Sequence, residues 1–274
     1  MIHLITYADK NFHLASKLLM SEARALNIFD KIHCYTPNEI KDFLSDKWIS
    51  KYPRGGGYWI WKPYIVSLEL GKMNDGDILL YVDAGCQFID SPKWDYYFDL
   101  LSQYDAIFMR FDRQVNYGFT PTVRCWTKKS AIRYFESSCE KKDWIDETQF
   151  ITGCFFVKKT SNTVKFIKKW GHFMCQHQDL VTDTTDEERD EQDPLFCEHR
   201  HDQAILSLLL YTTKGQYNFL FYPEEIEWHY NLDDNKRAII AARRKDSWAR
   251  NNKKRVFRKI IKNELISLRN QLCK

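Results

Sequence analysis

The stretch that most constrains this chain of 274 residues is DILLYVDAG, residues 77–85. Five residues from Ile78 to Val82 are apolar or aromatic without a break, which is typical of a central strand buried on both faces of a largely parallel sheet. Asp83 ends this strand, and the small residues Ala84 and Gly85 follow it. Ligands of open α/β sheets gather beyond the carboxyl ends of the strands, and small residues let a ligand approach the backbone. We therefore expect a binding site at Asp83, while an Asp that only caps a turn remains the structural alternative.

Strand and helix patterns alternate along most of the chain. Residues 2–7 and 31–35 are predicted strands, and residues 11–26 between them form a predicted amphipathic helix, which indicates a right-handed parallel βαβ start. Further strands are expected at 105–110, 151–159 and 217–222, with none after Lys236, and further helices at 37–44, 63–71, 94–101, 128–137, 161–173 and from Ala204. The prediction is an α/β protein with one mostly parallel central sheet flanked by helices.

Composition narrows the class of protein without choosing a function. Aromatic residues make up 15% of the chain, with 9 Trp and 15 Tyr, which suits either a dense core or a cleft that stacks flat rings. The 8 cysteines are scattered without a CxxC pair, so reduced thiols are expected. The N-terminus lacks the pattern of a signal peptide, and no apolar run approaches the roughly 18 to 20 residues that cross a bilayer. These features predict a cytoplasmic protein.

The net charge of +4 conceals a division of the chain. Residues 236–274 hold 14 Lys or Arg against 2 acids, so they carry +12, and the remainder carries −8. We therefore predict a catalytic or binding domain at 1–235 and a basic helical tail at 236–274. Apolar residues recur in the tail at helical spacing, with basic residues between them. This pattern predicts an amphipathic helix that rests on the domain, on a partner or, as a peripheral anchor, on an anionic membrane surface.

The stretch RGGGYWIWKPY, residues 54–64, has an unusual composition. Three glycines permit a tight loop, and Pro63 favours a helix start. Trp59, Trp61 and Lys62 would then stand at a loop-to-helix junction, where backbone N–H groups and a cation attract an anion. The spacing of a P-loop is absent. The alternative is that these aromatic side chains only pin the loop to the core.

Residues 179–202 hold 10 acids, most of which we expect in a solvated, mobile loop rather than in a metal site. A helix follows whose predicted first turn holds His201, Asp202 and Gln203. Acids stabilise helix N-termini, so Asp202 has a structural explanation beside a chemical one.

Four segments in order, GGGYWIWKPY, DILLYVDAGC, ITGCFFVKK and HDQAILSLL, carry a resemblance over residues 2–230. Together they resemble nucleotide-sugar-dependent glycosyltransferases of the GT-A fold, in particular bacterial-type enzymes that build surface polysaccharides. The resemblance implies transfer of a sugar from a nucleoside-diphosphate donor to the hydroxyl of a glycan or lipid-linked acceptor. A non-catalytic nucleotide- or sugar-binding module derived from such a transferase is the alternative.

In that family an Asp-x-Asp pair binds a divalent metal that bridges the donor phosphates and offsets the charge of the leaving group. This sequence matches the first carboxylate with Asp83 and has Gly85 in place of the second. Two substitutes are conceivable. His229 resembles a late histidine that joins Asp83 around Mn²⁺ or Mg²⁺. Alternatively, positive charge comes without metal from Lys62, Arg243 or Arg244.

The resemblance also assigns roles at the helix that begins near His201. If the reaction inverts configuration, Asp202 would be the base that accepts the acceptor proton; if it retains configuration, Asp202 or Gln203 would stabilise the positively charged sugar. The implied donor-binding residues are Thr6, Tyr7, Ala8, Trp59, Trp61, Lys62, Asp83, Ala84, Gly85, Thr152, Gly153 and His201.

Two other classes fit the sequence less well. Nucleic-acid binding through the basic tail is disfavoured because the rest of the chain is acidic and no RNA-reading or helix-turn-helix signature is present. A zinc site at Cys197, His199 and His201 lacks a fourth ligand at the usual spacing.

Overall fold

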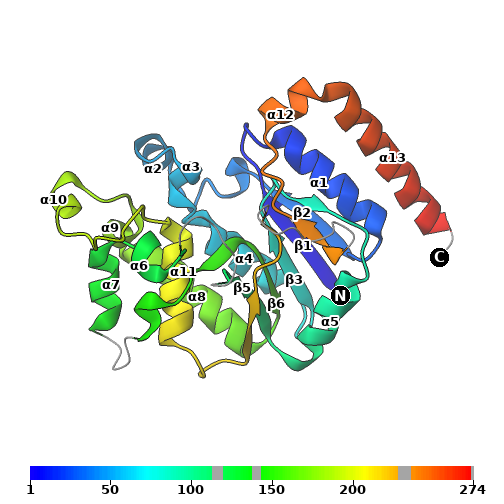
Figure 1. Ribbon diagram of the computed structural model, residues 1–274. Helices are drawn as coiled ribbons and strands as arrows, with labels where there is room; N and C mark the ends of the chain where they lie inside the picture. The colour runs from blue at the N-terminus through cyan, green and yellow to red at the C-terminus, as the bar shows by residue number, and fades with distance from the viewer. Residues whose placement is uncertain (113–119, 138–142, 228–235, 273–274) are drawn as a thin grey trace.

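The computed structural model describes residues 1–112, 120–137, 143–227 and 236–272 (Figure 1). At its centre is a six-stranded sheet with the order β2-β1-β3-β6-β5-β7. The strands are β1 (Ile2–Tyr7), β2 (Lys31–Tyr35), β3 (Ile78–Val82), β5 (Ala106–Arg110), β6 (Phe150–Lys158) and β7 (Phe219–Pro223). Every pair is parallel except those of β6, which runs antiparallel to both β3 and β5. The prediction of a mostly parallel α/β sheet is confirmed.

Strand β3 lies in the middle of the sheet, and its side chains alternate between two hydrophobic clusters. Leu79 and Tyr81 pack on one face, and Leu80 and Val82 on the other. All four are fully buried. A central strand with both faces covered explains the unbroken apolar run of the sequence, because neither face meets water.

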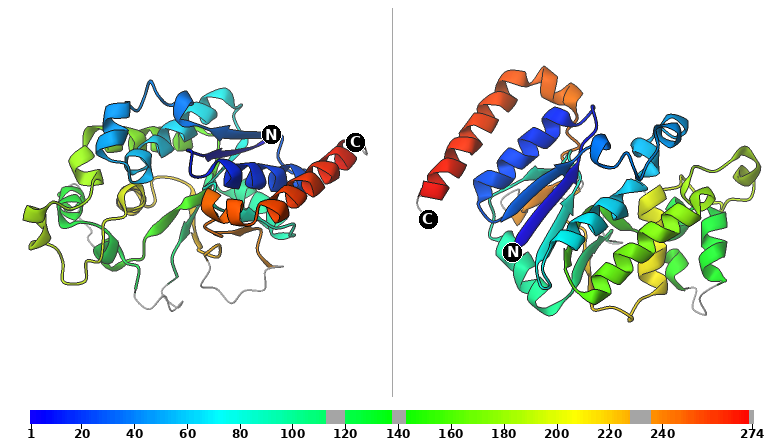
Figure 2. Two further views of the ribbon diagram at one scale, coloured as in Figure 1. Left: turned by 90° about the horizontal axis from the view of Figure 1, so that it is seen from above. Right: turned by 180° about the vertical axis from the view of Figure 1, so that it is seen from behind.

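Helices cover both faces of the sheet (Figure 2). The cluster that contains Leu79 and Tyr81 also holds side chains of α4 (Trp61–Lys72), α8 (Ser161–Gln176) and α11 (His201–Thr212). The cluster on the other face holds side chains of α1 (His13–Leu26) and α5 (Lys93–Gln103). This three-layer arrangement directs the carboxyl ends of β1 and β3 toward the loops that precede α1 and α4.

Short elements complete the described part of the chain. The helices are α2 (Asp46–Lys51), α3 (Gly55–Tyr58), α6 (Val123–Trp126), α7 (Lys129–Glu136), α9 (Gln178–Val181), α10 (Asp186–Arg189) and α12 (Asp246–Asn251), with single 3-10 turns at Pro37–Glu39 and Asp143–Asp146. Strands β4 (Gln87–Phe88) and β8 (Ile239–Ile240) form a second, two-stranded sheet.

Several expected elements differ from the structure. The helix expected at 37–44 is only the 3-10 turn Pro37–Glu39. The Glu39 carboxylate accepts hydrogen bonds from both the Thr36 N–H and hydroxyl, as at the start of a helix, but the turn ends at Ile40, whose side chain is buried in the core. Helix α4 begins at Trp61, before Pro63, because first-turn N–H groups have no partner within a helix and a proline there loses nothing. A strand does follow Lys236: β8 pairs antiparallel with β4.

The acidic segment 179–202 also differs in part from the expected loop. It includes the short helices α9 and α10, and its carboxylates pair with cations of other elements. The pairs are Arg54 with Asp183, Arg124 with Asp193 and Lys128 with Glu188, at 3.3, 2.8 and 3.4 Å. The charges that predicted a purely solvated loop therefore also hold this segment to the domain.

The basic tail forms α13 (Lys253–Leu272), which lies along α1 at one edge of the molecule (Figures 1 and 2). Arg24 and Glu264 form an ion pair of 2.6 Å between the two helices, and the Asn263 amide donates to the Ser21 hydroxyl at 3.1 Å. Val256 also packs against Leu18 of α1, so of the three surfaces expected for the tail, the domain itself covers one side of the helix. In the described residues no helix is long and apolar enough to cross a membrane.

Candidate functional site

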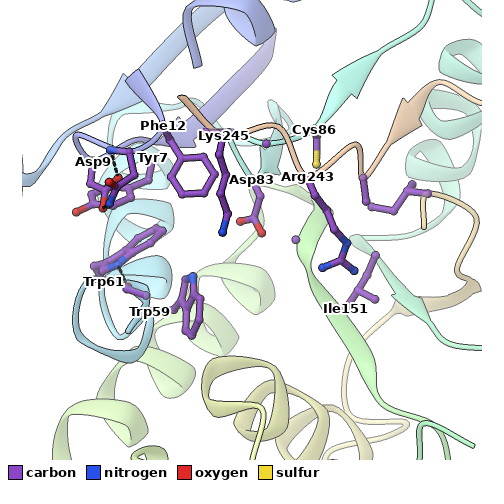
Figure 3. A pocket seen from close by; sticks show the side chains of 18 of the residues that line it. Tyr7, Asp9, Phe12, Trp59, Trp61, Asp83, Cys86, Ile151, Arg243 and Lys245 are labelled. Carbon is purple, nitrogen blue, oxygen red and sulfur yellow. Dashed lines mark hydrogen bonds between the residues drawn. The ribbon is translucent and has the colours of Figure 1, made fainter. Parts of the chain in front are cut away.

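A cavity of about 570 Å³ opens at the carboxyl ends of β1 and β3 (Figure 3). This volume is within the range of small-molecule sites in proteins. Its lining comes from six separate segments of the chain: Tyr7, Asp9, Asn11, Phe12; Pro53, Gly55, Gly56, Trp59, Trp61; Asp83, Ala84, Gly85, Cys86; Ile151, Gly153; Ile226, Glu227; and Ala241, Arg243, Lys245.

One wall of the cavity is aromatic. Trp61 stacks on Tyr7 with ring centroids 3.8 Å apart, and its indole N–H donates to the Gly55 carbonyl at 2.9 Å. Gly55 has a φ of +59°, and a side chain there would lie 2.3 Å from the Trp59 ring, so only glycine fits. Trp59 itself has a φ of +57°. The glycine-rich loop is thus folded tightly enough to present flat rings to a ligand.

The floor of the site, by which we mean Lys62, Tyr81, Asp83 and Asp202, joins three buried side chains to the partly exposed Asp83. The Lys62 ammonium lies 2.8 Å from Asp202 Oδ2 and 3.7 Å from Asp83 Oδ1, and it donates to the Thr152 carbonyl at 3.2 Å. Lys62 is 1% exposed and Asp202 4%, whereas 45% of the Asp83 side chain is exposed. One lysine from α4 therefore joins the carboxylate that faces the cavity to a carboxylate behind it.

Burial and charge act in opposite directions on the floor. Burial lowers the pKa of Lys62, but the carboxylates of Asp202 and Asp83 outweigh it and the net pKa is raised, so the ammonium stays charged at neutral pH. Burial, followed by the neighbouring Asp83, raises the pKa of Tyr81 well above its usual value. The Tyr81 hydroxyl therefore remains protonated and donates to Asp83 Oδ1 at 2.7 Å.

The wall opposite the aromatic rings comes from the basic C-terminal segment. We call Arg243 and Lys245, whose side chains reach into the cavity on either side of Asp83 in Figure 3, the cation wall. Arg244 between them points the other way and donates to both oxygens of Glu22, at 3.0 and 3.1 Å. Arg243 pairs with Glu227 at 2.7 Å, and in the described part of the chain Lys245 has no ion-pair partner.

The start of α11 supports the site from behind. His201 Nδ1 donates to the Val181 carbonyl at 2.8 Å, and its ring packs against Tyr58 at 4.4 Å. Burial lowers the pKa of His201, so it is neutral at pH 7. The Gln203 amide donates to the Gln149 side chain at 2.8 Å. Both side chains fix the packing of α11 near Asp202 rather than line the cavity.

The sequence-predicted site residues fall into two groups. Tyr7, Trp59, Trp61, Asp83, Ala84, Gly85 and Gly153 line the cavity. Thr6, Ala8, Lys62, Thr152, His201, Asp202 and Gln203 are not among its lining residues; Thr6, Thr152 and His201 are buried. His229 lies outside the described residues. Of the three cations weighed as metal substitutes, Arg243 lines the cavity, Lys62 lies beneath it and Arg244 faces Glu22.

Sequence reasoning missed several lining residues, namely Asp9, Asn11, Phe12, Glu227 and Lys245. Only Lys245 had a signal, the excess of positive charge after residue 235, and that signal predicted a separate tail rather than a wall of this site. The division of the chain at 236 stays a prediction.

The predicted divalent metal does not fit the donor set of the described residues. These residues hold no group of three His, Cys, Asp or Glu side chains that could bind a metal ion. Asp83 is the one acid at the end of β3, and its Oδ1 already accepts from Tyr81 and lies 3.7 Å from an ammonium. Hard divalent ions need several oxygen ligands, so no step below depends on a metal.

No known sequence family matches the chain, and no curated protein sequence matches it. Several solved structures do match the chain. A structure of the galactosyltransferase LgtC with donor and acceptor sugar analogues is 16% identical over 82% of this chain and 74% of its own, with a TM-score of 0.43. A glycosyltransferase involved in the glycosylation of the major capsid of PBCV-1 is 10% identical over 87% of this chain and 91% of its own, with a TM-score of 0.45. Mouse xyloside xylosyltransferase 1 is 10% identical over 83% and 87%, also at 0.45. These likenesses concern the course of the chain, and no residue role is taken from them.

Proposed function

We propose that this protein is a glycosyltransferase that moves a sugar from a nucleoside-diphosphate donor to an acceptor hydroxyl. The observation that carries the proposal is that Asp83, at the carboxyl end of the central strand, shares one cavity with an aromatic wall and a cation wall. Flat rings suit the base and sugar of a donor, and cations suit its diphosphate. Sugar transfer from such a donor requires that both parts be held together, because the diphosphate leaves with added negative charge.

Different residues of the cavity suit different parts of the donor. Trp59 and the stacked pair Tyr7 and Trp61 offer faces for the base or sugar. Asp83 is held by its N–H bond to the Gly153 carbonyl and by the Tyr81 hydroxyl, at 2.8 and 2.7 Å, so its carboxylate lines the cavity in a fixed position. A fixed carboxylate of this kind can accept hydrogen bonds from ribose or sugar hydroxyls.

Asp202 supports the reaction through Lys62. In this structure its carboxylate is buried and contacts the Lys62 ammonium, so its contribution is to keep that ammonium charged and in place under Asp83. The base role that the resemblance implies for Asp202, and the sugar-stabilising role for Gln203, stay predictions. A base must come within about 3 Å of the acceptor oxygen, which calls for a rearrangement of Lys62 when substrate binds.

Release of nucleoside diphosphate from a panel of UDP- and GDP-sugars tests the proposal directly. We expect slow hydrolysis of at least one donor without acceptor, and its loss in Asp83→Asn. The matched control is Asp75→Asn, because Asp75 is an exposed loop carboxylate far from the cavity lining. No release from any donor, with intact binding of the nucleoside diphosphate, favours the alternative function: a binding module without catalysis. The burial of Asp202 is the observation that favours a binding module without catalysis.

The acceptor and the location are argued from α13. Its buried side toward α1 holds Val256 beside the polar Asn263 and Ser267. Its outward side carries an apolar ridge of five side chains that are each more than half exposed: Phe257, Ile261, Leu265, Leu268 and Leu272. Exposed basic residues flank the ridge, among them Lys254, Arg258, Lys262 and Arg269. An apolar ridge with cationic flanks fits the interface of an anionic membrane. We therefore place the enzyme on the inner face of a membrane, where a lipid-linked or glycan acceptor of polysaccharide synthesis would meet it.

Sedimentation with vesicles tests this placement. The full chain should sediment with phosphatidylglycerol vesicles and not with phosphatidylcholine vesicles, and Phe257→Ser/Leu265→Ser should remove most of the binding. Leu195→Ser, which changes an equally exposed leucine outside the ridge, is the control. Equal binding by the ridge variant and the control would remove the membrane from the proposal and leave the transferase reaction untouched.

A further inference from the structure

We infer that the cation wall, Arg243 and Lys245, neutralises the diphosphate of the donor in place of a divalent metal. The inference rests on the proposed function, because it takes the ligand to be a nucleoside-diphosphate sugar. Its starting point is Gly85, the position two residues after Asp83 where a second metal-binding carboxylate would have to stand.

Gly85 has little space for a side chain. A Cβ built on it would lie 3.0 Å from the Arg244 carbonyl oxygen and 3.3 Å from the Arg244 nitrogen. Both are backbone atoms, and the Arg244 N–H donates to the Gly85 carbonyl at 2.9 Å. The chain that carries the cation wall therefore crosses directly over the place of the missing carboxylate.

Contacts on both sides hold this crossing segment in place, so moving it would lower the stability of the protein. The buried Arg244 side chain pairs with the buried Glu22, and β8 pairs with β4 just before it. Just after it, the Asp246 carboxylate accepts from the N–H groups of Leu14 and Ala15 at the start of α1, at 2.7 and 3.2 Å. A side chain at position 85 would have to push this backbone back by a few tenths of an ångström against these contacts, so the fold disfavours a second acid there.

The first carboxylate is also poorly placed for a metal. The Lys62 ammonium, 3.7 Å from Asp83 Oδ1, would repel a divalent cation at that oxygen. Lys62 is fully buried between Asp83 and Asp202, and it has no alternative position in solvent. The Lys62 ammonium therefore already supplies, from the interior of the protein, the positive charge that a metal would bring to Asp83.

The cation wall is prepared for an anion. Arg243 has a φ of +50°, a conformation that costs a non-glycine residue roughly 1 to 2 kcal/mol and that often marks a functional position. Its side chain is 66% exposed and is held by Glu227 at 2.7 Å. Lys245 is exposed and, among the described residues, has no ion-pair partner. A guanidinium can bind two phosphate oxygens at once, and an ammonium can bind a third.

Calorimetric titration with UDP, GDP, ADP and CDP tests the inference on the full chain, in EDTA and again in excess Mn²⁺. We expect at least one of these to bind in EDTA, with an affinity that Mn²⁺ changes by no more than about twofold. Arg243→Gln and Lys245→Gln should each weaken that binding by about tenfold, and the pair by more, with a shallower salt dependence. Binding of the matching nucleoside, which lacks phosphate, should be unchanged.

Two surface variants serve as matched controls. Arg250→Gln and Lys253→Gln remove exposed cations of the same C-terminal segment that do not line the cavity, and both should bind the nucleoside diphosphate as the parent does. Since Arg243 and Lys245 are exposed, their variants should keep the thermal unfolding midpoint of the parent.

The results separate this inference from the proposed function. Binding that EDTA abolishes and Mn²⁺ restores, or wild-type affinity in both wall variants, would overturn the inference while the transferase proposal stands. Failure of every nucleoside diphosphate to bind under either condition would overturn both.

Discussion

Lys62 and Lys245 serve the same cavity, yet the protein holds them in opposite ways. Lys62 is 1% exposed and lies between two carboxylates, whereas Lys245 is exposed and has no ionic partner in the described residues. A buried ammonium must be paired, because an unpaired buried charge is costly. An exposed ammonium is hydrated and remains available to a ligand. The comparison indicates two roles: the floor holds the site in place, and the cation wall is available to bind a ligand.

Removal of the buried charge should have the largest effect. Lys62→Met should lower the free energy of unfolding by about 3 to 5 kcal/mol, because it leaves Asp202 buried without a counter-charge. Lys245→Met should change it by less than about 0.5 kcal/mol, as usual for a surface position. Urea unfolding of both variants measures the contrast. Lys62→Met/Asp202→Leu should recover part of the loss, and equal stability of the two single variants would erase the distinction between floor and wall.

Asp202→Asn should reduce transfer by about 10² to 10⁴-fold and leave the Kd of the nucleoside diphosphate nearly unchanged, because Asp202 acts behind the cavity. Arg243→Gln should show the reverse, a weaker Kd at a smaller cost in turnover. Asp202→Glu sharpens the result: recovery of activity with an unchanged pH profile indicates that the carboxylate positions Lys62, and a shifted pH profile indicates a base. Near-normal turnover of Asp202→Asn would refute both roles.

The buried histidines His199 and His201, behind the site, should make the stability of the protein depend on pH. Burial lowers the pKa of both His199 and His201 below the ordinary 6.5. Below about pH 6.5 the unfolded chain takes up protons that the folded chain refuses, so stability falls as pH falls, by up to about 1.4 kcal/mol per pH unit for each histidine. The loss stops once pH is below the folded pKa values.

Urea unfolding at pH 7.5 and 5.5 measures this loss. His201→Asn should reduce the slope, and asparagine suits the φ of +42° at this position. The exposed His13→Asn is the control. A pH slope that is unchanged in His201→Asn would contradict the assignment.

The smallest effect is expected at the exposed ion pair that joins α13 to α1. Arg24 and Glu264 are each about 40% exposed, so their double-mutant coupling energy should be about 0.2 to 1 kcal/mol and should fall with salt. The buried pair Arg244 and Glu22, which anchors the cation wall, should give a larger coupling in the same measurement. Similar couplings would mean that burial does not distinguish the two anchors.

The main strands of the fold follow from local sequence. The apolar run Ile78–Val82 is typical of a strand covered on both faces, and the strand ends at Asp83 because burying a charged residue inside the sheet would be costly. The helix expected at 37–44 has the start signal of a helix, a capping box between Thr36 and Glu39, yet it ends at Ile40, whose side chain is buried in the core. Local signals do not reveal where tertiary packing ends a helix.

The sequence by itself determined the central strand, the carboxylate at its end and the aromatic, glycine-rich loop beside it, because each depends on neighbours within a few residues. Only the tertiary structure decided that Asp202 lies behind Lys62, and that residues 241–245 close over Gly85 and bring two cations to the cavity. Those contacts join residues more than 100 positions apart. The net charge of a segment records how many cations it holds, but not which of them the fold turns toward a ligand.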